Sequence, residues 1–333
     1  KKEYEDFIQE VDGHYYGIGV EIKSIGGRII VVSPIEGSPA AKAGLKPGDE
    51  IIRVNGESIE GNNILDAVKK IRGSKGTSVN LEISRKLADG SDFQILNFTV
   101  LRDEISLQPV KGVKLPDNVL YIRVSKFLTG TAEAIKDILR EHRNEKIYGI
   151  ILDVRLNPGG LLKEVLQTVD LFLDKGLILE TRSRHKSQQK KYYATDRIII
   201  KPVPCVILID KGSASASEIL AGALKENGYA LLVGEKTFGK GSVQTSFELP
   251  SGDALVLTTA EYYTKSGLKI DGNGIEPTFE VKNPEAKYVF SQDWHLDASK
   301  FLNADDPVFN FALQKIKEMI EYTHIDHPSV VEN

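Results

Sequence analysis

Short apolar runs alternate with amphipathic segments through the middle of this 333-residue chain. The runs have the length of buried strands and cover residues 119–124, 147–154, 203–209 and 230–233. The segments between them carry apolar residues at helical spacing and cover residues 131–142, 161–173 and 215–227. Because this alternation is typical of a parallel sheet covered by helices, the sequence predicts an α/β core over residues 104–282.

A different pattern precedes this core. Short strand-like runs punctuated by glycine predict a β-rich domain over residues 16–103. Within this domain, Ser38 followed by a proline predicts the start of a very short helix. Asn55-Gly56 predicts a tight turn, and residues 63–72 a longer amphipathic helix.

Both ends of the chain are predicted to be helical, as an N-terminal arm (residues 1–15) and a C-terminal region (residues 283–333). Their apolar stripes, within 4–11 and 306–322, have no obvious core left to cover them. The stripes either pack on their own core or meet across a homodimer, which is the interpretation we favour.

Composition and charge argue against several classes of protein, namely nucleic-acid binders, membrane-spanning proteins and metalloproteins. The net charge is −4 with both signs interspersed, so no basic surface for nucleic acid is predicted. No apolar run approaches the roughly 20 residues that span a bilayer, and the chain opens on Lys1 rather than Met, so a leader is expected to have been removed. The single cysteine, Cys205, is expected to be a buried structural thiol. One cysteine and six scattered histidines offer no metal-ligand spacing, and no metal or other cofactor is predicted.

Three glycine-rich junctions follow strands of the predicted core, at the strand ends where open α/β sheets place ligands. They are Asn157-Pro158-Gly159-Gly160, residues 211–218 around Ser215, and residues 235–244 around Lys240. Taken alone, each has an ordinary interpretation, as a tight turn, a serine N-cap and an exposed lysine.

Together, the junctions can supply a nucleophile and its base. A serine hydroxyl is a weak nucleophile until a base accepts its proton, and a neutral lysine can replace histidine as that base. Lys240 lies between Gly239 and Gly241, which offer no side chain to solvate its ammonium, so a desolvated amine in a closed cleft is predicted. No histidine lies in the three junctions, and the nearest candidate, His14, lies close to the β-rich domain, so a Ser-His-Asp triad has little support.

These motifs, in this order, resemble the signature of the carboxyl-terminal processing peptidases, also called the tail-specific protease family. Lys265-Ser266-Gly267 and residues 271–277 resemble the closing motif of that family. The resemblance implies a crotonase-like (ClpP/crotonase-type) protease core that cleaves proteins near their C-termini with a Ser-Lys dyad. It implies the following roles: Ser215 as nucleophile, Lys240 as base, Gln244 as the residue that orients the lysine, and the backbone N–H groups of Ala216 and of either Gly159 or Gly160 as oxyanion donors. Ser213 then fits as an N-cap and Ser217 as helix packing.

The β-rich domain resembles a PDZ domain. Its segment Tyr16-Gly17-Ile18-Gly19-Val20 is similar to a loop whose N–H groups bind a terminal carboxylate, while an extended peptide pairs with the following strand. Arg72 is a candidate for contact with the carboxylate or the core, or is simply exposed. The implied partners are proteins or peptides with free C-termini, and their capture is expected to gate access to the cleft.

Two other functions stay open. The chain could be a non-catalytic PDZ scaffold on a crotonase-like core. It could also be a crotonase-fold acyl-transfer or hydratase enzyme, which the PDZ domain disfavours. The family resemblance further implies an extracytoplasmic location, in the cell envelope or periplasm or outside the cell.

Overall fold

The structure, a computed structural model, describes residues 13–326 except 36–37, 60, 62, 88–91, 185, 187–188, 200, 250–253, 286–287 and 289–304. It divides into two compact units, residues 13–107 and the residues from 108 onward. Most of the predicted N-terminal arm, residues 1–12, lies outside the described residues. Among the helices that the structure describes, none is long and apolar enough to cross a membrane.

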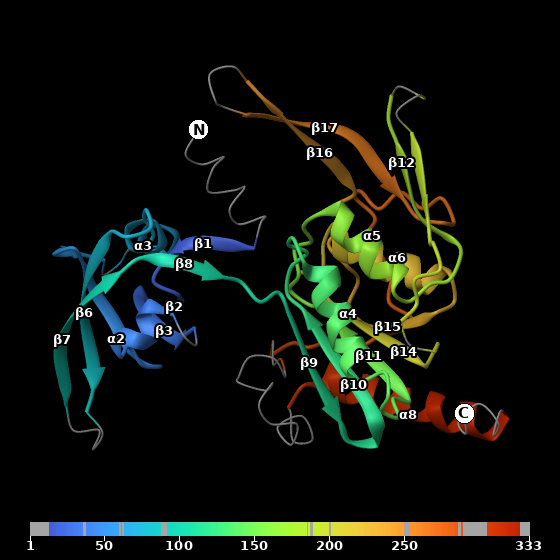
Figure 1. Cartoon of the computed structure of the whole chain (residues 1–333), viewed down its shortest axis with the longest axis horizontal. Coiled ribbons are helices and arrows are strands. Elements are labelled where there is room, and N and C mark those ends of the chain that lie inside the picture. Colours follow the sequence, from blue (N-terminus) through green and yellow to red (C-terminus); the bar gives the residue numbers. More distant parts are fainter. Residues whose placement is uncertain are drawn as a thin grey trace. The chain divides into compact units, whose positions relative to one another are not determined.

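The first unit, in blue to teal in Figure 1, is an antiparallel sheet with strand order β2-β3-β4-β6-β7. Its strands are β2 (Val20–Ile25), β3 (Arg28–Pro34), β4 (Glu50–Val54), β5 (Glu57–Ser58, paired with β4), β6 (Ser78–Lys86) and β7 (Phe93–Leu101). A separate ladder joins β1 (His14–Gly17) to β8 (Asp103–Ser106). The two helices are α2 (Pro39–Ala43) and α3 (Ile64–Ile71). Because β2 lies at the end of the sheet order, one of its sides is unpaired by any described strand.

Local signals in this unit are confirmed. Ser38 caps α2, its Oγ accepting the Ala41 N–H at 3.2 Å, and Asn63 caps α3 in the same way. Asn55 and Gly56 both have positive φ, +51° and +82°, the backbone of the tight turn that their sequence predicts.

The second unit is built on a sheet with order β18-β15-β14-β11-β10-β9, parallel except for β9. Its strands are β9 (Val110–Leu115), β10 (Val119–Val124), β11 (Gly149–Asp153), β14 (Cys205–Ile209), β15 (Ala230–Gly234) and β18 (Phe279–Glu280); a short 3-10 turn, η1 (Pro116–Asn118), joins β9 to β10. The three predicted helices are present as α4 (Thr131–Glu141), α5 (Leu162–Asp170) and α6 (Ala216–Glu226), and they cover one face of this sheet. Cys205 is fully buried in β14, and burial raises the pKa of its thiol, which fits a structural role.

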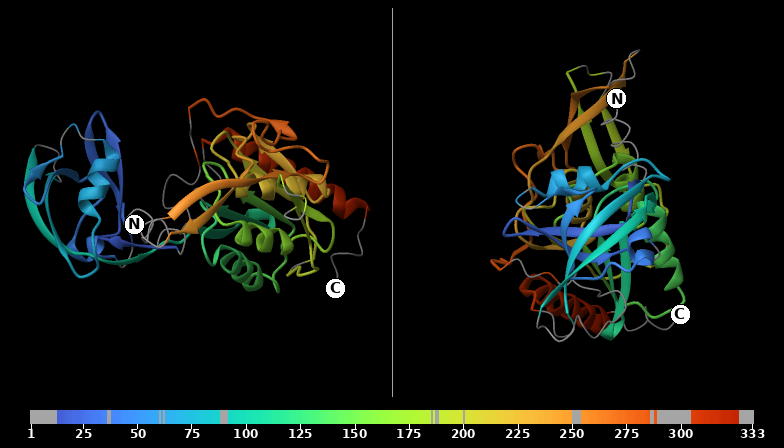
Figure 2. Two further views of the ribbon diagram at one scale, coloured as in Figure 1. Left: turned by 90° about the horizontal axis from the view of Figure 1, so that it is seen from above. Right: turned by 90° about the vertical axis from the view of Figure 1, so that its left-hand side faces the viewer.

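Helix α8 (Pro307–Asp326) covers the opposite face of this sheet (Figures 1 and 2). Alternate residues of β10 divide between the faces, Leu120 toward α4 to α6 and Tyr121 toward α8. The apolar stripe of α8, including Phe309 and Ile316, is buried in that second cluster. The homodimer interface expected on this helix therefore loses its basis, because the sheet of the same chain already covers the stripe.

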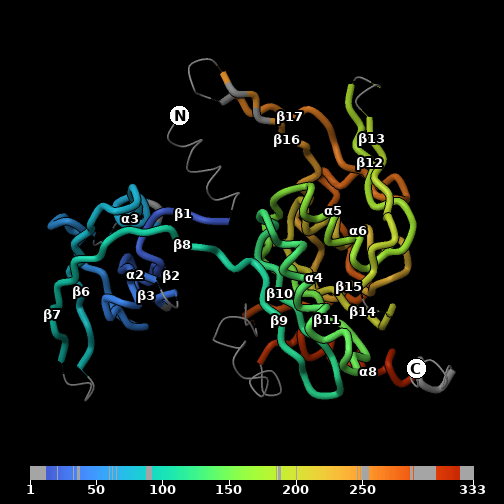
Figure 3. Tube along the Cα trace, in the orientation of Figure 1, coloured from blue at the N-terminus to red at the C-terminus, as the bar shows by residue number. Residues whose placement is uncertain are grey.

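A second, antiparallel sheet with order β13-β12-β17-β16 completes this unit, and Figure 3 traces its two hairpins. Its strands are β12 (Leu177–Arg182), β13 (Lys190–Tyr193), β16 (Ser242–Glu248) and β17 (Ala254–Tyr263). The β16–β17 hairpin is the one that the sequence predicts, whereas β12 and β13 were not predicted. Since β16 begins two residues after Lys240, this sheet continues directly from one of the three junctions.

Candidate active site

The three glycine-rich junctions follow β11, β14 and β15, which are neighbours in the parallel sheet. Parallel strands end at the same edge, so the Pro-Gly-Gly turn, the serine turn and the lysine loop gather there. We call these segments the glycine turn (156–160), the serine turn (210–215) and the lysine loop (237–241).

Ser215 has a strained backbone. It stands immediately before α6 with φ 55° and ψ −112°, a conformation that side-chain-bearing residues rarely adopt. Strain of this kind persists only where the surroundings impose it, and it is known at serine nucleophiles on sharp strand-to-helix turns. The turn places Ser215 at the positive end of the helix dipole of α6.

The neighbouring serines are committed to structural hydrogen bonds. Ser213 Oγ donates to the Val154 carbonyl at 2.8 Å, and Ser217 Oγ donates to the Asn157 carbonyl at 3.0 Å. Both side chains are completely buried. Ser215 is only half-buried, and its hydroxyl donates to no residue within the described part of the chain.

The N-cap predicted for Ser213 is wrong. Ser215 occupies the N-cap position of α6, two residues further along. Ser213 instead joins two junctions, because its Oγ also accepts the Asp210 N–H at 3.0 Å while it binds the strand end at Val154.

The glycine turn lies against the serine turn. A Cβ on Gly159 would lie 2.7 Å from Ser215 Cβ and 2.9 Å from Ala216 N, so only glycine fits there. The Gly159 N–H donates to Asn157 Oδ1 at 2.9 Å. The N–H groups of Gly160 and Ala216 have no hydrogen-bond partner among the residues that the structure describes.

Glu218, to which the sequence assigned no role, joins the serine turn to the lysine loop. Its buried Oε2 accepts the N–H groups of both Ser215 and Lys240, each at 2.8 Å. Its Oε1 accepts the Gly239 N–H at 2.7 Å and the Thr237 hydroxyl at 2.6 Å. One carboxylate thus fixes the backbones of both candidate catalytic residues.

The closing motif holds the lysine loop from its other side. The Gly241 N–H donates to Asp271 Oδ1 at 3.1 Å, and the Gly272 N–H donates to the Gly239 carbonyl at 2.9 Å. The Ile275 N–H donates to Thr237 Oγ1 at 2.7 Å. The family motif therefore supports the loop that carries Lys240.

The side chains of Lys240 and Gln244 are exposed. Within the described residues, no hydrogen bond joins Lys240 Nζ to Ser215 or to Gln244. The desolvated amine predicted from the sequence is therefore not formed in this structure, although the backbones of the two loops are brought together.

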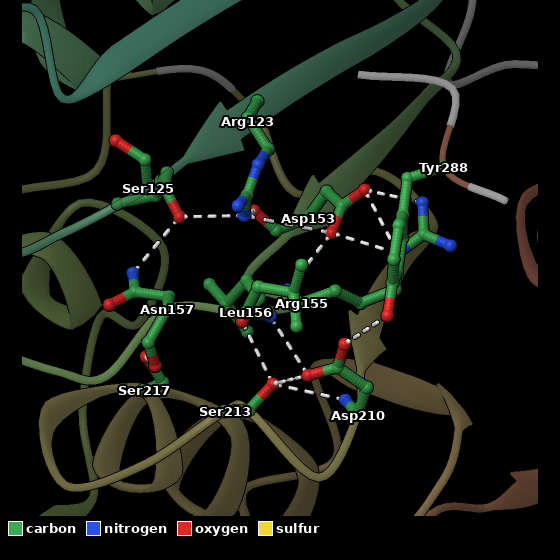
Figure 4. Close-up of polar contacts among 12 residues, drawn as sticks. Arg123, Ser125, Asp153, Arg155, Leu156, Asn157, Asp210, Ser213, Ser217 and Tyr288 are labelled. Atoms are coloured by element: carbon green, nitrogen blue, oxygen red, sulfur yellow. Dashed lines mark hydrogen bonds and ion pairs between the residues drawn. The ribbon is translucent and has the colours of Figure 1, made fainter. Parts of the chain in front are cut away.

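A buried ionic network lies beneath the glycine turn (Figure 4). Arg155 binds Asp153 at 2.7 Å and Asp306, just before α8, at 2.9 Å. Burial by itself raises a carboxyl pKa, but the guanidinium groups of Arg155 and Arg123 hold the pKa of Asp153 below its ordinary value. Beyond the charged residues at the end of β11, no sequence pattern indicated this network.

The first unit contains a separate pocket. It is lined by Tyr15, Gly17, Ile18, Gly19, Val20, Ile22, Val68, Ile71 and Arg72, which include all five peptide-binding residues predicted from the sequence. Of the alternatives for Arg72, the structure shows the exposed side chain, and its guanidinium carbon lies 4.5 Å from the Tyr15 ring centroid. Burial raises the pKa of Tyr15, and the charge of Arg72 partly opposes that effect.

The pocket has the features of a peptide groove. It lies along β2, whose outer side is unpaired by any described strand, and against α3. Within the described residues the N–H groups of Ile18 and Gly19 have no partner, so they can donate hydrogen bonds to a carboxylate.

Comparison with known proteins matches both units. Residues 118–281 match peptidase family S41, and residues 30–85 match a PDZ domain. The carboxy-terminal processing protease CtpA of Bacillus subtilis is 36% identical over 97% of this chain and 67% of its own length. CtpB of the same organism is 42% identical over 86% of this chain and 59% of its own length.

A solved structure agrees with these matches. The photosystem II D1 C-terminal processing protease is 28% identical, with a TM-score of 0.55 over 89% of this chain and 78% of that chain. The chain spans about two thirds or less of the length of the two Bacillus subtilis relatives.

Proposed function

This chain belongs to peptidase family S41 and to its carboxy-terminal processing proteases, and we propose that it is a serine endopeptidase with a Ser215–Lys240 dyad. The observation that carries the proposal is the strained backbone of Ser215, whose hydroxyl donates to no described residue while those of Ser213 and Ser217 donate to backbone carbonyls. The shared carboxylate of Glu218 supports it, because it holds both members of the dyad.

In the proposed reaction, the neutral amine of Lys240 accepts the proton of Ser215 Oγ as the oxygen attacks the substrate carbonyl. The oxyanion forms beside the glycine turn, where N–H groups would stabilise it. We assign the donors to Ala216 and Gly160, because the Gly159 N–H is already bound by Asn157. The protonated lysine then gives its proton to the leaving amine, and water hydrolyses the acyl-enzyme.

Lys240 must turn inward for this reaction. Its backbone is held on both sides, by Glu218 and by the turn at Asp271, so the change required is a rotation of the side chain. Gln244 follows the loop at the start of β16 and is proposed to orient the inward lysine.

The first unit is proposed to capture the substrate C-terminus. An extended peptide would pair with the open side of β2, with its carboxylate at the N–H groups of Ile18 and Gly19. Arg72 borders the same pocket and adds positive charge there. Occupation of this groove is proposed to gate access to Ser215.

A non-catalytic PDZ scaffold is the second candidate. One observation favours it, namely that the side chains of Lys240 and Gln244 are exposed and unpaired with Ser215 within the described residues. A scaffold would bind C-terminal peptides and cleave none.

Three further features stay proposals. The crotonase-like arrangement of the core and the extracytoplasmic location are both implied by the family. A homodimer would need a surface other than the stripe of α8, which is buried on its own sheet.

The two candidates are separated by incubating the chain with an unfolded protein and identifying the fragments by mass spectrometry. The peptidase predicts fragments that disappear in Ser215→Ala and persist in the matched variants Ser213→Ala and Ser217→Ala. Fragments that persist in purified Ser215→Ala would refute the nucleophile, and a wild-type chain that binds peptides but cleaves none would favour the scaffold.

A further inference from the structure

Asp210, at the end of β14, joins the serine turn to the glycine turn from beneath (Figure 4). Its Oδ1 accepts the Leu156 N–H at 2.8 Å and the Gly212 N–H at 2.9 Å. The Ser213 hydroxyl lies 3.3 Å from the same oxygen. The carboxylate is buried, with 7% of the residue exposed, so these bonds form largely out of water.

Leu156 is the residue whose backbone this carboxylate holds. Its φ is +54°, in the left-handed region that a leucine seldom occupies, and half of its side chain is exposed. Packing of the Leu156 side chain therefore does not explain the conformation. The hydrogen bond from its N–H to Asp210 does, and the close approach of Gly212 to Leu156 Cα keeps the two turns in contact.

The glycine turn is also held beyond Leu156, at Asn157 and at Gly159, whose carbonyl accepts the Phe127 N–H at 2.8 Å. The Asn157 carbonyl accepts the Ala214 N–H and the Ser217 hydroxyl, each at 3.0 Å. Asp210, Asn157 and Phe127 together fix where Gly160 lies relative to Ser215. Without Asp210, the contacts at Asn157 and Phe127 would remain, but Leu156 would lose the bond that holds its left-handed conformation.

We propose that Asp210 is a positioning residue for the oxyanion donors, acting through the backbone of Leu156. The inference rests on the proposed peptidase function and deepens it, because it explains how the donors are kept at a fixed distance from Ser215. Asp210 touches no substrate in this role.

Tyr288 completes the site on its outer side. Its hydroxyl donates to Asp210 Oδ2 at 3.1 Å, and the Arg155 guanidinium carbon lies 5.2 Å from its ring centroid. Tyr288 thus connects the C-terminal region to the turn beneath Ser215. It binds the oxygen that Leu156 does not use, so we expect its loss to matter less than the loss of Asp210.

The test compares kcat and KM of full-length Asp210→Ala and Asp210→Asn on one peptide substrate. Asp210→Ala should lower kcat about 100-fold with KM little changed, because a displaced donor weakens only the transition state. Asp210→Asn keeps an acceptor oxygen and should recover about tenfold of that loss.

The matched control is Asp170→Ala, at the end of α5. Asp170 is also a buried carboxylate, with 8% exposed, and it also accepts a backbone N–H and a hydroxyl, both from Thr195. Its loss should lower thermal stability without a specific fall in kcat of the folded enzyme.

A second substitution, Leu156→Gly, tests whether Asp210 acts through the backbone of Leu156. Glycine adopts the left-handed conformation without a carboxylate to hold it, so in the Asp210→Ala background it should raise kcat again. The effect is measured as a coupling between the two sites, with Leu156→Gly alone as reference. If the role of Asp210 were purely structural, Leu156→Gly would restore the stability of Asp210→Ala but not its kcat.

Tyr288→Phe, which removes one hydroxyl, should lower kcat a few-fold and serves as a mild variant if Asp210→Ala fails to fold.

The outcomes separate the two proposals. If the wild-type chain cleaves no substrate, the proposed function fails and the positioning role fails with it. If the wild type cleaves and Asp210→Ala keeps its kcat, only the positioning role is overturned. It is also overturned if the variant loses no more kcat than Asp170→Ala and gains nothing from Leu156→Gly. If Asp210→Ala does not fold, unchanged kcat in both Asp210→Asn and Tyr288→Phe overturns it.

Discussion

The serine turn and the lysine loop carry the two halves of the proposed dyad, and they differ in how completely they are fixed. Ser215 is held in a strained conformation, with bound hydroxyls on both sides of it. Lys240 is held in its backbone, but its side chain is exposed. The serine half carries the strain, whereas the lysine half is exposed and would have to turn inward in the proposed reaction.

This difference has a physical reason. A positive φ at a serine costs free energy, about 1–3 kcal/mol, so it persists only in a fully packed turn. The flexible four-carbon stem of a lysine can change rotamer, so the exposed side chain of Lys240 needs no such packing. Regulation of the proposed enzyme would therefore cost less free energy if it moved the lysine side chain than if it moved the serine turn.

We expect the largest effect from a substitution of Lys240, the lysine half of the proposed dyad. Lys240→Arg should lower kcat by about 10⁴-fold or more, because guanidinium stays protonated and cannot accept the serine proton. The measurement is kcat on a peptide substrate. Lys236→Arg is the matched control, since Lys236 is exposed and paired with Glu276 at 2.6 Å. Activity in Lys240→Arg would mean that another group activates Ser215.

We expect the next largest effect from a substitution of Glu218, whose carboxylate binds the backbone N–H groups of both Ser215 and Lys240. Glu218→Gln replaces one acceptor oxygen by an amide NH₂, which would face N–H donors on one side of the group. Both Ser215 and Lys240 should shift, and we expect kcat to fall by about 10²–10³-fold.

Glu226→Gln, in the same helix, is the control for Glu218→Gln. Glu226 also binds a threonine and a serine, Thr264 and Ser266, but no catalytic loop. An equal loss of kcat in the two variants would mean that α6 responds as a whole and that Glu218 has no special role.

The sequence predicted the parts of this site that depend on local chemistry. The strand and helix alternation of the core, the cap at Ser38 and the β16–β17 hairpin follow from residue type and spacing. The motifs around Ser215 and Lys240 identified the family because their order is specific. All of these signals lie within a few residues of the element they determine.

The contacts that join distant segments were not predictable in this way. Glu218 was visible only as the last residue of a serine motif, yet it binds the lysine loop 22 residues away. The burial of α8 on its own sheet reversed the expectation of a dimer interface, because an apolar stripe does not reveal what covers it. Asp210 and Tyr288 are separated by 78 residues, and no spacing rule relates them.

A third prediction asks whether the peptide groove is as fully formed as the serine turn. Binding to the full chain with Ser215→Ala, which avoids cleavage, is measured for one fluorescent peptide with a free or an amidated C-terminus. Amidation should raise Kd about tenfold or more, because charge-assisted bonds to the N–H groups of Ile18 and Gly19 are lost. Equal affinities would show that the groove does not read the terminal carboxylate.

We expect the smallest effects from substitutions of the two serines that flank Ser215. Ser213→Ala leaves the Val154 carbonyl and the Asp210 N–H without their shared partner, whereas Ser217→Ala removes one bond to the Asn157 carbonyl. Each should cost about 1–2 kcal/mol of unfolding free energy, with Ser213→Ala the larger, while kcat stays within a few-fold of wild type. Denaturant unfolding and kcat on the same samples give both values. If either variant lost kcat as severely as Ser215→Ala without losing stability, the lack of a bond donated by the Ser215 hydroxyl to any described residue would no longer distinguish Ser215. The strained turn would then have to be explained by packing alone.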